Sequence, residues 1–511
     1  MGDIRLTDEQ KLIVNSIYGN DKIIKIEAGA GSGKTFSMIE LVKEIRKTDK
    51  ECRILYMVFN RNMIDEAKLK FDSANLDVDC YSTYGFALKR FTAIKKEEII
   101  VKSSVDFNLF MKFKNKVKYK KSWIQYKTIV ELFNAYCLSF DKLDVFVKQV
   151  GASPEKYGLK ERISSIAIEL FKDIYSEMIS NNEYLHGMYL KAYACEEKDK
   201  IRGYKYVIID ECADSGQFLL NIVNRIECDK KYFVGDTNQA IYGFLRCVNA
   251  FKKYDGLSLS LSTSFRFNDE ICKVANDILS SHFDDFKHGD VKNSHNNTTI
   301  ADDKEETIIF RRNSTLFQHA ISLVGNNEND IKVIFLDTVN GKNTAYFDDT
   351  FSEMIYFYFK LLESIDKDRA IEFSKKFRIV YSKQIETYVK IASKENKGLF
   401  NYLTYSKKIL PLDLEKFFNF FTMNKHNLID ILEKVRHSEN IIDYKKCYLL
   451  ISLHRAKGLE WSNVTIPEDA WSLNSDEEVR ILYTAVTRAM HNLNYEPVKR
   501  LLEEKMLIGT K

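Results

Sequence analysis

The stretch IEAGAGSGKTF, residues 26–36, decides the fold of this 511-residue chain. Its tail, Gly33-Lys34-Thr35, is the most specific part of the nucleotide-binding loop pattern G-x-x-x-x-G-K-[ST]. In such a loop the backbone amides cradle phosphates, Lys34 reaches the β- and γ-phosphates, and the Thr35 hydroxyl ligates Mg²⁺. The first glycine of the usual spacing is Ala28 here, so the match to the general pattern is incomplete.

The context of the loop supports this interpretation. A short apolar run at 23–26 precedes the loop, and residues 36–45 follow it with the pattern of a helix. Gly31 and Ser32 complete the glycine-rich segment between them. The alternative, an ordinary glycine-rich turn before a helix, is disfavoured by this order of strand, loop and helix. The sequence therefore predicts a site for ATP or GTP with Mg²⁺.

Length and composition limit the number of domains and the class of protein. At roughly 150 residues per domain, 511 residues suggest about three to four domains. The net charge of +4, from 77 basic and 73 acidic residues, is too small to identify a partner. The nine cysteines are scattered, which indicates neither a zinc site nor a disulfide framework. No apolar run approaches the roughly 18 to 20 residues that span a bilayer, and the start MGDIRLTDEQ lacks a signal-peptide pattern. We expect a soluble intracellular protein with no membrane partner.

Two parts of the chain alternate strand-like apolar runs with amphipathic helices. One combines residues 1–90 with 200–280, and the other combines 305–340 with 445–495. Each pattern predicts an α/β unit around a parallel sheet. The intervening segments are rich in Lys, Phe, Tyr and Leu at helical spacing, which predicts mostly helical insertions.

A second phosphate-site element follows at YVIIDECAD, residues 206–214. A buried strand that ends in two carboxylates delivers them to the carboxyl edge of a parallel sheet, where nucleotides bind. We expect Asp210 to hold Mg²⁺ and Glu211 to act as the general base toward the attacking water. A solvated helix start after a strand is the alternative, and the presence of the Lys34 loop disfavours it.

The segment KYFVGDTNQAIYGF repeats the pattern of an apolar strand followed by polar residues. Gln239 after this strand can hydrogen-bond the γ-phosphate or the attacking water. Tyr242 and Phe244 follow it, and aromatic faces stack on nucleic-acid bases at roughly 1 to 3 kcal/mol per base. Phe244 near a phosphate sensor therefore suggests a base-stepping device, and burial of both rings in the core is an equally supported alternative.

Together with the motifs that follow, these segments make the chain resemble a superfamily 1 DNA helicase of the UvrD/Rep/PcrA type. The family loop commonly reads AGAGSGKT, so Ala28 matches it. DECAD is similar to its D-E-x-x-D box, and GDTNQAIYGF is similar to its G-D-x-x-Q-x-I-Y box. LTDEQKLIV, LSTSFRF, SLHRAKGLEW and EEVRILYTAVTRA resemble further family boxes in the family order. FNRNMIDEAKLKF, IYGFLRCVNAF and AKGLEW resemble the branch that includes the F-box DNA helicases, and we expect only the motor core of that branch.

The resemblance implies a fold and its divisions. The fold is α/β, with two RecA-like parallel-sheet lobes and mostly helical insertions in each. The first lobe would take residues 1–90 and 200–257 with an insertion at 91–199, and the second would take 258–340 and 445–511 with a reduced insertion at 341–444.

The resemblance also implies roles at an ATP site. Gln10 would contact the adenine, Phe265 would stack on it, and Glu460 would contact the ribose side. Phe36 stands where the family has an arginine near the adenine, so this contact is either lost or replaced by stacking. Arg266 and Arg488 would contact the γ-phosphate and stabilise charge on the transferring phosphoryl group. The catalytic set is then Lys34, Asp210, Glu211, Gln239, Arg266 and Arg488.

DNA contacts follow from the same resemblance. The candidates are Phe59, Asn60, Tyr84, Phe244, Arg246, His454 and Trp461. The first insertion adds MKFKNKVKYKKSWIQYK, residues 111–127, whose interleaved lysines and aromatics suit a single-strand groove. A solvated lysine-rich helix with a buried aromatic stripe is an equal alternative.

The sequence departs from the family at several places. Phe36 stands where the family often has arginine, and Tyr84 lies in Ser-Thr-Tyr-Gly where the family reads T-x-H-S. Leu245-Arg246 replaces the expected Arg-Gly pair. The insertion of the second lobe is much shorter than in UvrD-type enzymes.

Two functions remain open. One is an ATP-dependent single-stranded DNA translocase and 3′ to 5′ helicase, acting on single strands and on junctions with duplex in repair, recombination or replication. The other is an ATP-gated nucleic-acid sensor or a regulatory helicase subunit of a nuclease complex, with weak unwinding alone. A nuclease or a repair or replication factor is a possible protein partner. The expected location is the nucleoid-containing cytoplasm or the nucleus.

Overall fold

A computed structural model describes residues 5–58, 61–113, 122–159, 162–241, 247–283, 305–326, 331–336, 351–405, 410, 412–442 and 444–509. The chain divides into two compact units. The first comprises Met1–Ala28, Lys34–Thr237 and Tyr242–Leu261. The second comprises Gly29–Gly33, Asn238–Ile241 and Ser262–Lys511.

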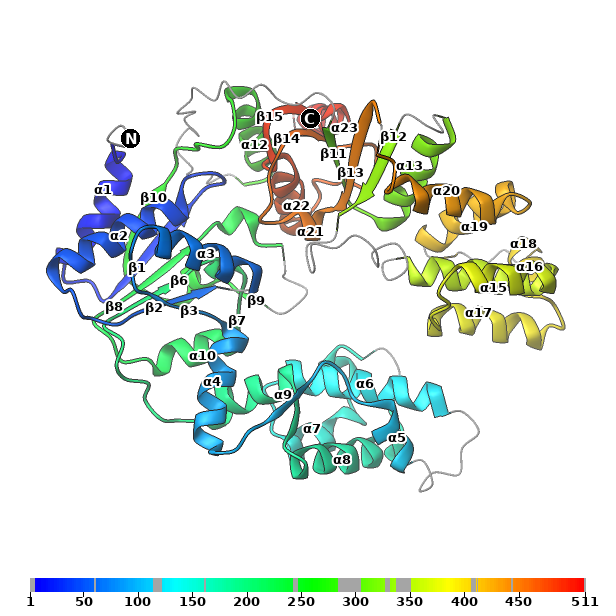
Figure 1. The fold of residues 1–511 in the computed structure, drawn as a ribbon, viewed down its shortest axis with the longest axis horizontal. Coiled ribbons are helices and arrows are strands. Elements are labelled where there is room, and N and C mark those ends of the chain that lie inside the picture. The colour runs from blue at the N-terminus through cyan, green and yellow to red at the C-terminus, as the bar shows by residue number, and fades with distance from the viewer. Residues whose placement is uncertain are drawn as a thin grey trace. The chain divides into compact units, whose positions relative to one another are not determined.

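The first unit is built on a six-stranded parallel sheet (Figure 1). Its strands, in spatial order, are β10 (Leu257–Leu261), β1 (Ile23–Ala28), β8 (Lys230–Gly235), β6 (Tyr206–Ile209), β2 (Ile54–Val58) and β3 (Asp79–Ser82). Every residue of β2 and β6 is buried, as expected for central strands that are covered on both faces. The strand at 23–28 and the helix at 34–48 therefore flank the glycine-rich loop as its sequence predicts.

Helices cover both faces of this sheet. One face packs against α2 (Lys34–Thr48) and α3 (Arg61–Ser73) in a core that includes Tyr56 and Val58. The intervening residues of β2, Leu55 and Met57, belong to a second core on the opposite face. α1 (Asp8–Asn15) and α10 (Gln217–Arg225) complete the cover.

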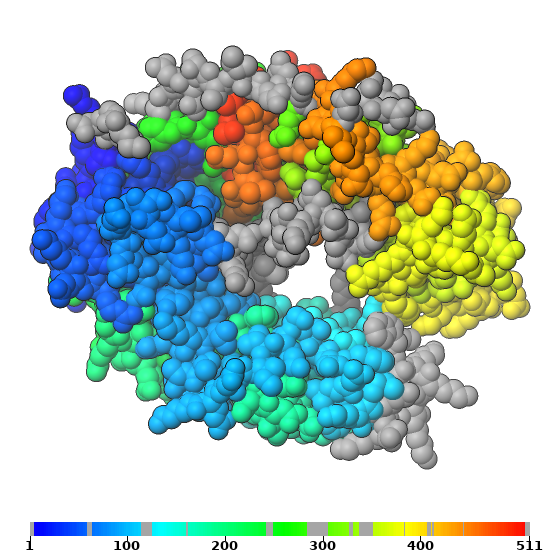
Figure 2. All heavy atoms as spheres, in the orientation of Figure 1, coloured from blue at the N-terminus to red at the C-terminus, as the bar shows by residue number. Residues whose placement is uncertain are grey.

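The second core continues into a helical part between β3 and β6. It contains α4 (Thr83–Lys95), α5 (Phe107–Phe113), α6 (Ser122–Leu138), α7 (Leu143–Val150), α8 (Ser165–Ser180) and α9 (His186–Lys191). Two short parallel strands, β4 (Ile100–Lys102) and β5 (Glu183–Leu185), connect its ends. In Figure 2 the atoms of these helices, coloured from blue through cyan to blue-green along the chain, lie together.

This helical part tests one interpretation of the lysine-rich stretch at 111–127. The Tyr126 ring lies edge-on to Phe107 and Phe110, and its hydroxyl donates to the Val105 carbonyl at 2.6 Å. At this position the aromatic ring is half-buried and packs against the core, as the second alternative predicts for an aromatic residue of this stretch. Residues 114–121 lie outside the described part of the chain.

The second unit has a five-stranded parallel sheet in the order β12 (Ile331–Phe335), β13 (Lys446–Ser452), β11 (Glu305–Phe310), β14 (Trp461–Thr465) and β15 (Ala489–Asn494). Around it lie α12 (Asp269–Ser280), α13 (Asn313–Asn326), α21 (Leu453–Ala456), α22 (Asp476–Val486) and α23 (Glu496–Gly509). Both sheets are parallel, so the predicted α/β fold with two RecA-like lobes is confirmed.

A second helical part lies between β12 and β13. It contains α15 (Ser352–Ile365), α16 (Lys367–Lys376), α17 (Lys383–Lys394), α18 (Leu399–Tyr405), α19 (Leu412–Asn424) and α20 (Leu428–Ser438). Its buried Phe, Tyr and Leu side chains form one core with β11, β12 and α13. No helix in the described part of the chain is long and apolar enough to span a membrane.

Candidate functional site

The carboxyl edge of the first sheet brings together polar residues that are far apart in the sequence. β1, β8 and β6 are neighbours, and Lys34, Asp236 and Asp210 follow their carboxyl ends. The Lys34 ammonium lies 3.1 Å from the Glu211 carboxylate, and this ion pair is only 14 to 16% exposed. The predicted lysine, the predicted Mg²⁺ ligand and the predicted general base therefore form one cluster in the first unit.

The acidic side chains of this cluster shift the pKa of its lysine. Burial disfavours the Lys34 ammonium, but the carboxylates of Glu211, Asp210 and Asp236 outweigh that effect and raise the pKa of Lys34. Burial, followed by the neighbouring Glu211 carboxylate, raises the pKa of Asp210. Three carboxylates beside one ammonium leave an excess of negative charge, so the cluster suits a phosphate chain only together with a divalent cation such as Mg²⁺.

The carboxylate of Asp210 is held at both oxygens. Its Oδ1 accepts the Glu211 backbone amide at 2.8 Å, and its Oδ2 accepts the Tyr56 hydroxyl at 2.5 Å. Glu211 itself has a φ of 53°, in the left-handed region that costs a non-glycine residue roughly 1–2 kcal/mol. Such local strain is common at functional sites, where surrounding structure maintains it.

The loop Gly29–Gly33 has a backbone suited to phosphate. Gly31 and Gly33 have φ values of 70° and 77°, which direct successive amides to one side of the chain. Ser32 is 2% exposed, and its hydroxyl has no hydrogen-bond partner among the described residues. The loop ends where α2 begins at Lys34, so the amino end of a helix dipole adds positive potential. These features fit a bound phosphate chain.

The residues also fit Mg²⁺. Among the described residues, no group of three or more His, Cys, Asp or Glu side chains is placed to hold a metal. Mg²⁺ in nucleotide sites commonly takes one or two carboxylates, with substrate phosphates and waters as its other ligands. Thr35 lies in the first turn of α2, and Asp210 and the Thr35 hydroxyl stay the predicted protein ligands.

Within the second unit a separate cluster joins three predicted residues. The Arg266 guanidinium lies 2.7 Å from the Glu460 carboxylate and donates to the Thr487 carbonyl at 3.0 Å. Arg488 is 1% exposed and donates to the Thr487 hydroxyl at 3.2 Å. The two arginines predicted to contact the γ-phosphate therefore lie beside each other, with the predicted ribose contact.

The loop Gly29–Gly33 groups with this second unit and makes close contacts there. The Phe265 amide donates to the Gly31 carbonyl at 2.8 Å. A Cβ on Gly31 would lie 2.5 Å from Arg266 Cβ, so only glycine fits. The predicted adenine-stacking ring of Phe265 is 41% exposed, and Gln239 is buried after β8.

Gln10 and Phe36 lie in the first unit. Gln10 is buried and forms a capping box at the start of α1, with its side-chain oxygen accepting the Thr7 amide at 3.0 Å. Phe36 is half-buried in the first turn of α2. Both roles toward adenine stay predictions.

The predicted DNA contacts are only partly described. Tyr84, in the first turn of α4, is 42% exposed with its ring edge-on to His186. In the second unit, Trp461 is half-buried at the start of β14. His454 in α21 is half-buried, and burial lowers its pKa, which favours the neutral ring. Phe59, Asn60, Phe244 and Arg246 lie outside the described residues.

One site residue was missed by the sequence analysis. Tyr56 contacts Asp210 from β2, and the only local sign was a single hydroxyl within the apolar strand ILYMV.

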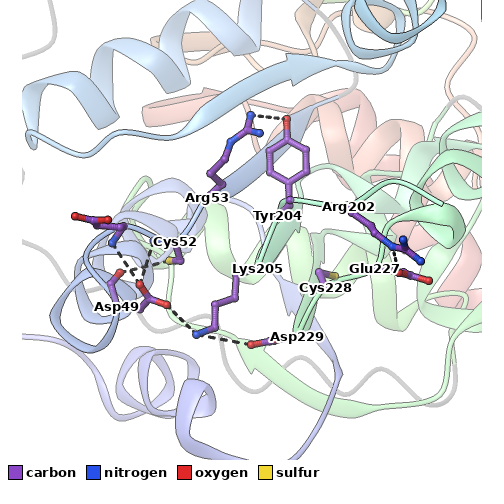
Figure 3. A pocket seen from close by; sticks show the side chains of 11 residues that line it. Asp49, Cys52, Arg53, Arg202, Tyr204, Lys205, Glu227, Cys228 and Asp229 are labelled. Atoms are coloured by element: carbon purple, nitrogen blue, oxygen red, sulfur yellow. Dashed lines mark hydrogen bonds and ion pairs between the residues drawn. The ribbon is translucent and has the colours of Figure 1, made fainter. Parts of the chain in front are cut away.

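The first unit also has a pocket at another edge of its sheet (Figure 3). Its lining comes from the segments just before β2, β6 and β8, so it lies at the amino ends of the strands. Its cations are paired: Lys205 with Asp49, Arg202 with Glu227, and Arg53 with Asp79. This pocket contains none of the predicted nucleotide residues.

Comparison with known families and proteins agrees with these clusters. The UvrD/REP helicase N-terminal domain matches residues 6–252, and the UvrD-like helicase C-terminal domain matches residues 448–494. The first match contains Lys34, Asp210 and Glu211, and the second contains Glu460 and Arg488.

Individual relatives point the same way. F-box DNA helicase protein 1 of Schizosaccharomyces pombe is 27% identical over 544 residues, covering 96% of this chain and 57% of the relative. F-box DNA helicase 1 of Gallus gallus is 23% identical over 536 residues, covering 96% of this chain and 49% of the relative. The mitochondrial ATP-dependent DNA helicase HMI1 of Saccharomyces cerevisiae is 24% identical over 300 residues, covering 54% of this chain and 41% of the relative. The chain thus spans about half the length of the curated relatives that it matches along most of its own length. With both family domains present in the expected order, the chain belongs to the UvrD-like helicases.

Proposed function

We propose that this chain is an ATP-dependent DNA helicase that moves along single-stranded DNA. The observation that carries the proposal is the cluster of Lys34, Asp210 and Glu211 at the carboxyl edge of a parallel sheet. The names of the relatives, all DNA helicases, support the choice of DNA as the track.

The geometry suggests how the chain's residues act. Lys34 pairs with Glu211 in the structure, so binding of a triphosphate gives Lys34 a new anionic partner and releases Glu211 to accept a proton from water. Asp210 and Thr35 would hold Mg²⁺, which when bound neutralises charge on the phosphates. Gln239 would orient the attacking water.

The second unit would supply further positive charge to the transferring phosphoryl group. Arg266 and Arg488 are proposed to stabilise the transferring phosphoryl group, an effect worth about 10³ to 10⁵ in turnover for arginines in comparable sites. Because Arg266 is paired with Glu460, its guanidinium must exchange a carboxylate for a phosphate when it acts. ATP-dependent closure of the lobes would then couple hydrolysis to stepping between bases.

The strand contacts and the polarity rest on the resemblance to the family. Tyr84, Phe244, His454 and Trp461 would stack on or lie against bases, and movement would run 3′ to 5′. The site of action would be a DNA-containing compartment, in repair, recombination or replication.

A second candidate is an ATP-gated nucleic-acid sensor or regulatory subunit of a nuclease complex. The short segment 341–444 favours it, because the corresponding family insertion tunes unwinding and partners. In this case DNA would stimulate ATP hydrolysis, but strand separation would need a protein partner.

ATP hydrolysis with and without single-stranded DNA, beside unwinding of duplexes with a 3′ or a 5′ tail, tests the proposal. Stimulated hydrolysis and opening of only the 3′-tailed duplex are expected, with Lys34→Ala as the inactive control. Stimulation without unwinding would favour the sensor. Hydrolysis that DNA does not change would contradict both functions.

A further inference from the structure

Strand β2 carries one hydroxyl in an otherwise apolar and fully buried sequence. The five residues of ILYMV are all buried, and Tyr56 is 1% exposed. Its hydroxyl donates to Asp210 Oδ2 at 2.5 Å, from a position 154 residues earlier in the chain. Because an unpaired buried hydroxyl costs roughly 1–3 kcal/mol, this hydroxyl depends on its carboxylate partner.

The strand pairing of the sheet places Tyr56 and Asp210 on the same face. β2 and β6 are adjacent and parallel, and Tyr56 is paired in register with Ile208. Asp210 lies two residues beyond Ile208, so strand alternation places it on the same face as Tyr56. The Phe71 ring of α3 lies edge-on to Tyr56 at 5.2 Å and holds the phenol from the side.

Tyr56 therefore completes the support of Asp210. The Glu211 amide holds Oδ1 and the Tyr56 hydroxyl holds Oδ2, so the carboxylate cannot rotate without breaking one of two hydrogen bonds. Each oxygen keeps one further lone pair for a ligand. Partners of this kind orient a metal ligand, and their loss commonly costs about 10- to 100-fold in metal affinity or activity.

We propose that Tyr56 is a positioning residue that orients Asp210 for the Mg²⁺ that accompanies the nucleotide. The inference rests on the proposed function, because it deepens the role of the same site. A merely structural role would instead stabilise the fold without linking Tyr56 to Mg²⁺.

The test measures how much Mg²⁺ strengthens nucleotide binding. A fluorescent non-hydrolysable ATP analogue is titrated into the full chain with and without Mg²⁺, and the ratio of the two affinities is compared between variants. Tyr56→Phe is expected to reduce this ratio about tenfold and to leave the affinity without Mg²⁺ unchanged.

Tyr232→Phe is the matched control. Tyr232 is equally buried on β8 of the same sheet, and its hydroxyl lies 3.5 Å from Ser16 Oγ rather than beside a carboxylate. We expect this variant to keep the full effect of Mg²⁺. Thermal unfolding of both variants shows whether any loss reflects folding.

Asp210→Asn provides the second comparison. If Tyr56 acts through Asp210, adding Tyr56→Phe to Asp210→Asn causes no further loss of the Mg²⁺ effect. A full additional loss would show that Tyr56 acts by another route and would overturn the proposal. If Tyr56→Phe does not fold, Phe71→Leu loosens the ring while keeping the hydroxyl, and an unchanged Mg²⁺ effect in that variant would contradict the inference.

The wild-type chain shows whether a failed test concerns the nucleotide site or only the role of Tyr56. If Mg²⁺ does not strengthen nucleotide binding by the wild type, the proposed nucleotide site is wrong. If it does, and Tyr56→Phe behaves like the wild type, only the role of Tyr56 is wrong.

Discussion

At the residue scale, the site brings one lysine and three carboxylates together in a largely buried cluster. Lys34, Asp210, Glu211 and Asp236 are close enough to shift the pKa of the lysine, and Glu211 holds a backbone conformation that few side chains adopt. Their arrangement is specified by three parallel strands that end side by side. Single side chains in this cluster are therefore expected to change chemistry more than folding.

The first prediction concerns the two ends of the ion pair. Lys34→Ala should abolish detectable ATP turnover, because the phosphates lose their ammonium partner. Glu211→Gln should lower turnover by about 10²-fold or more, because an amide cannot accept the proton of the attacking water. Steady-state phosphate release measures both.

Nucleotide binding distinguishes these two variants. Glu211→Gln is expected to keep binding a fluorescent ATP analogue, since Lys34 loses a competing partner and gains freedom to reach phosphate. Glu40→Gln, on the exposed side of α2 in an ion pair with Lys43, is the control and should hydrolyse ATP normally. Normal turnover by Glu211→Gln would remove Glu211 from the role of base.

At the element scale, helix α9 approaches α6 at a glycine. A Cβ on Gly187 would overlap Cys137 Cβ and lie 2.8 Å from Cys137 Sγ. Such close helix packing is possible only because one partner lacks a side chain. The contact joins two helices of the first helical part, which share one core with the sheet.

Gly187→Ala should therefore destabilise the first unit by about 1–3 kcal/mol through overpacking. Thermal unfolding followed by circular dichroism measures the effect. Combining Gly187→Ala with Cys137→Gly removes the overlapping side chain and should recover part of the loss, but only part, because a glycine inside α6 itself costs about 1 kcal/mol. Gly216→Ala is the control, since nothing lies within 4 Å of its added Cβ. An unchanged unfolding temperature for Gly187→Ala would mean that the helices separate at low cost.

A pH-dependent element lies in the second unit, where α20 ends. Glu439 accepts the Phe335 amide of β12 at 3.2 Å, and burial raises the pKa of its carboxyl to about 7 from an ordinary 4.5. The folded chain binds this proton more tightly than the unfolded chain. Its stabilising contribution is therefore complete below about pH 4.5 and is lost as the pH rises through about 7.

Glu439→Gln should remove this dependence. The amide oxygen can still accept the Phe335 amide, and no buried charge forms at high pH. We expect the free energy of unfolding of the variant to exceed that of the wild type by roughly 1–2 kcal/mol at pH 8, allowing for the partial exposure of Glu439. At pH 5 the two values should differ little. Unfolding temperatures of variant and wild type at pH 5 and pH 8 measure this difference. Glu415→Gln, at an exposed position of α19, is the control. An equal gain at both pH values would exclude titration of Glu439 as the cause.

At the scale of the whole molecule, the proposed function requires hydrolysis and strand movement to be separable. Phe244→Ala should keep basal ATP turnover and lose most of its stimulation by single-stranded DNA, because stacking on a base supplies about 1–3 kcal/mol. Hydrolysis assayed over a range of DNA concentrations measures this. Tyr405→Ala, which removes a 77% exposed ring from α18, is the control and should keep the stimulation. Full stimulation of the Phe244 variant would make the stacking assignment wrong.

Much of the molecule could be predicted from local pattern. The glycine loop between a strand and a helix follows from local spacing: the predicted run at 23–26 and helix at 36–45 lie within β1 and α2, and the strand before Asp210 is likewise observed. The boxes around Arg266, Glu460 and Arg488 were found by resemblance, and these residues do lie together in the second unit. Their roles toward phosphate and ribose stay predictions.

The sequence by itself determined the fold class, the phosphate loop and the candidate charges, because strand and helix periods and glycine placement are properties of neighbouring residues. Only the tertiary structure decided that Tyr56 holds Asp210 and that Tyr126 packs against the core of the first helical part. Each of these depends on which strands become neighbours or on which polar partner a side chain meets after packing. Local periodicity places a side chain on a face, whereas strand order and long-range contacts choose its partner.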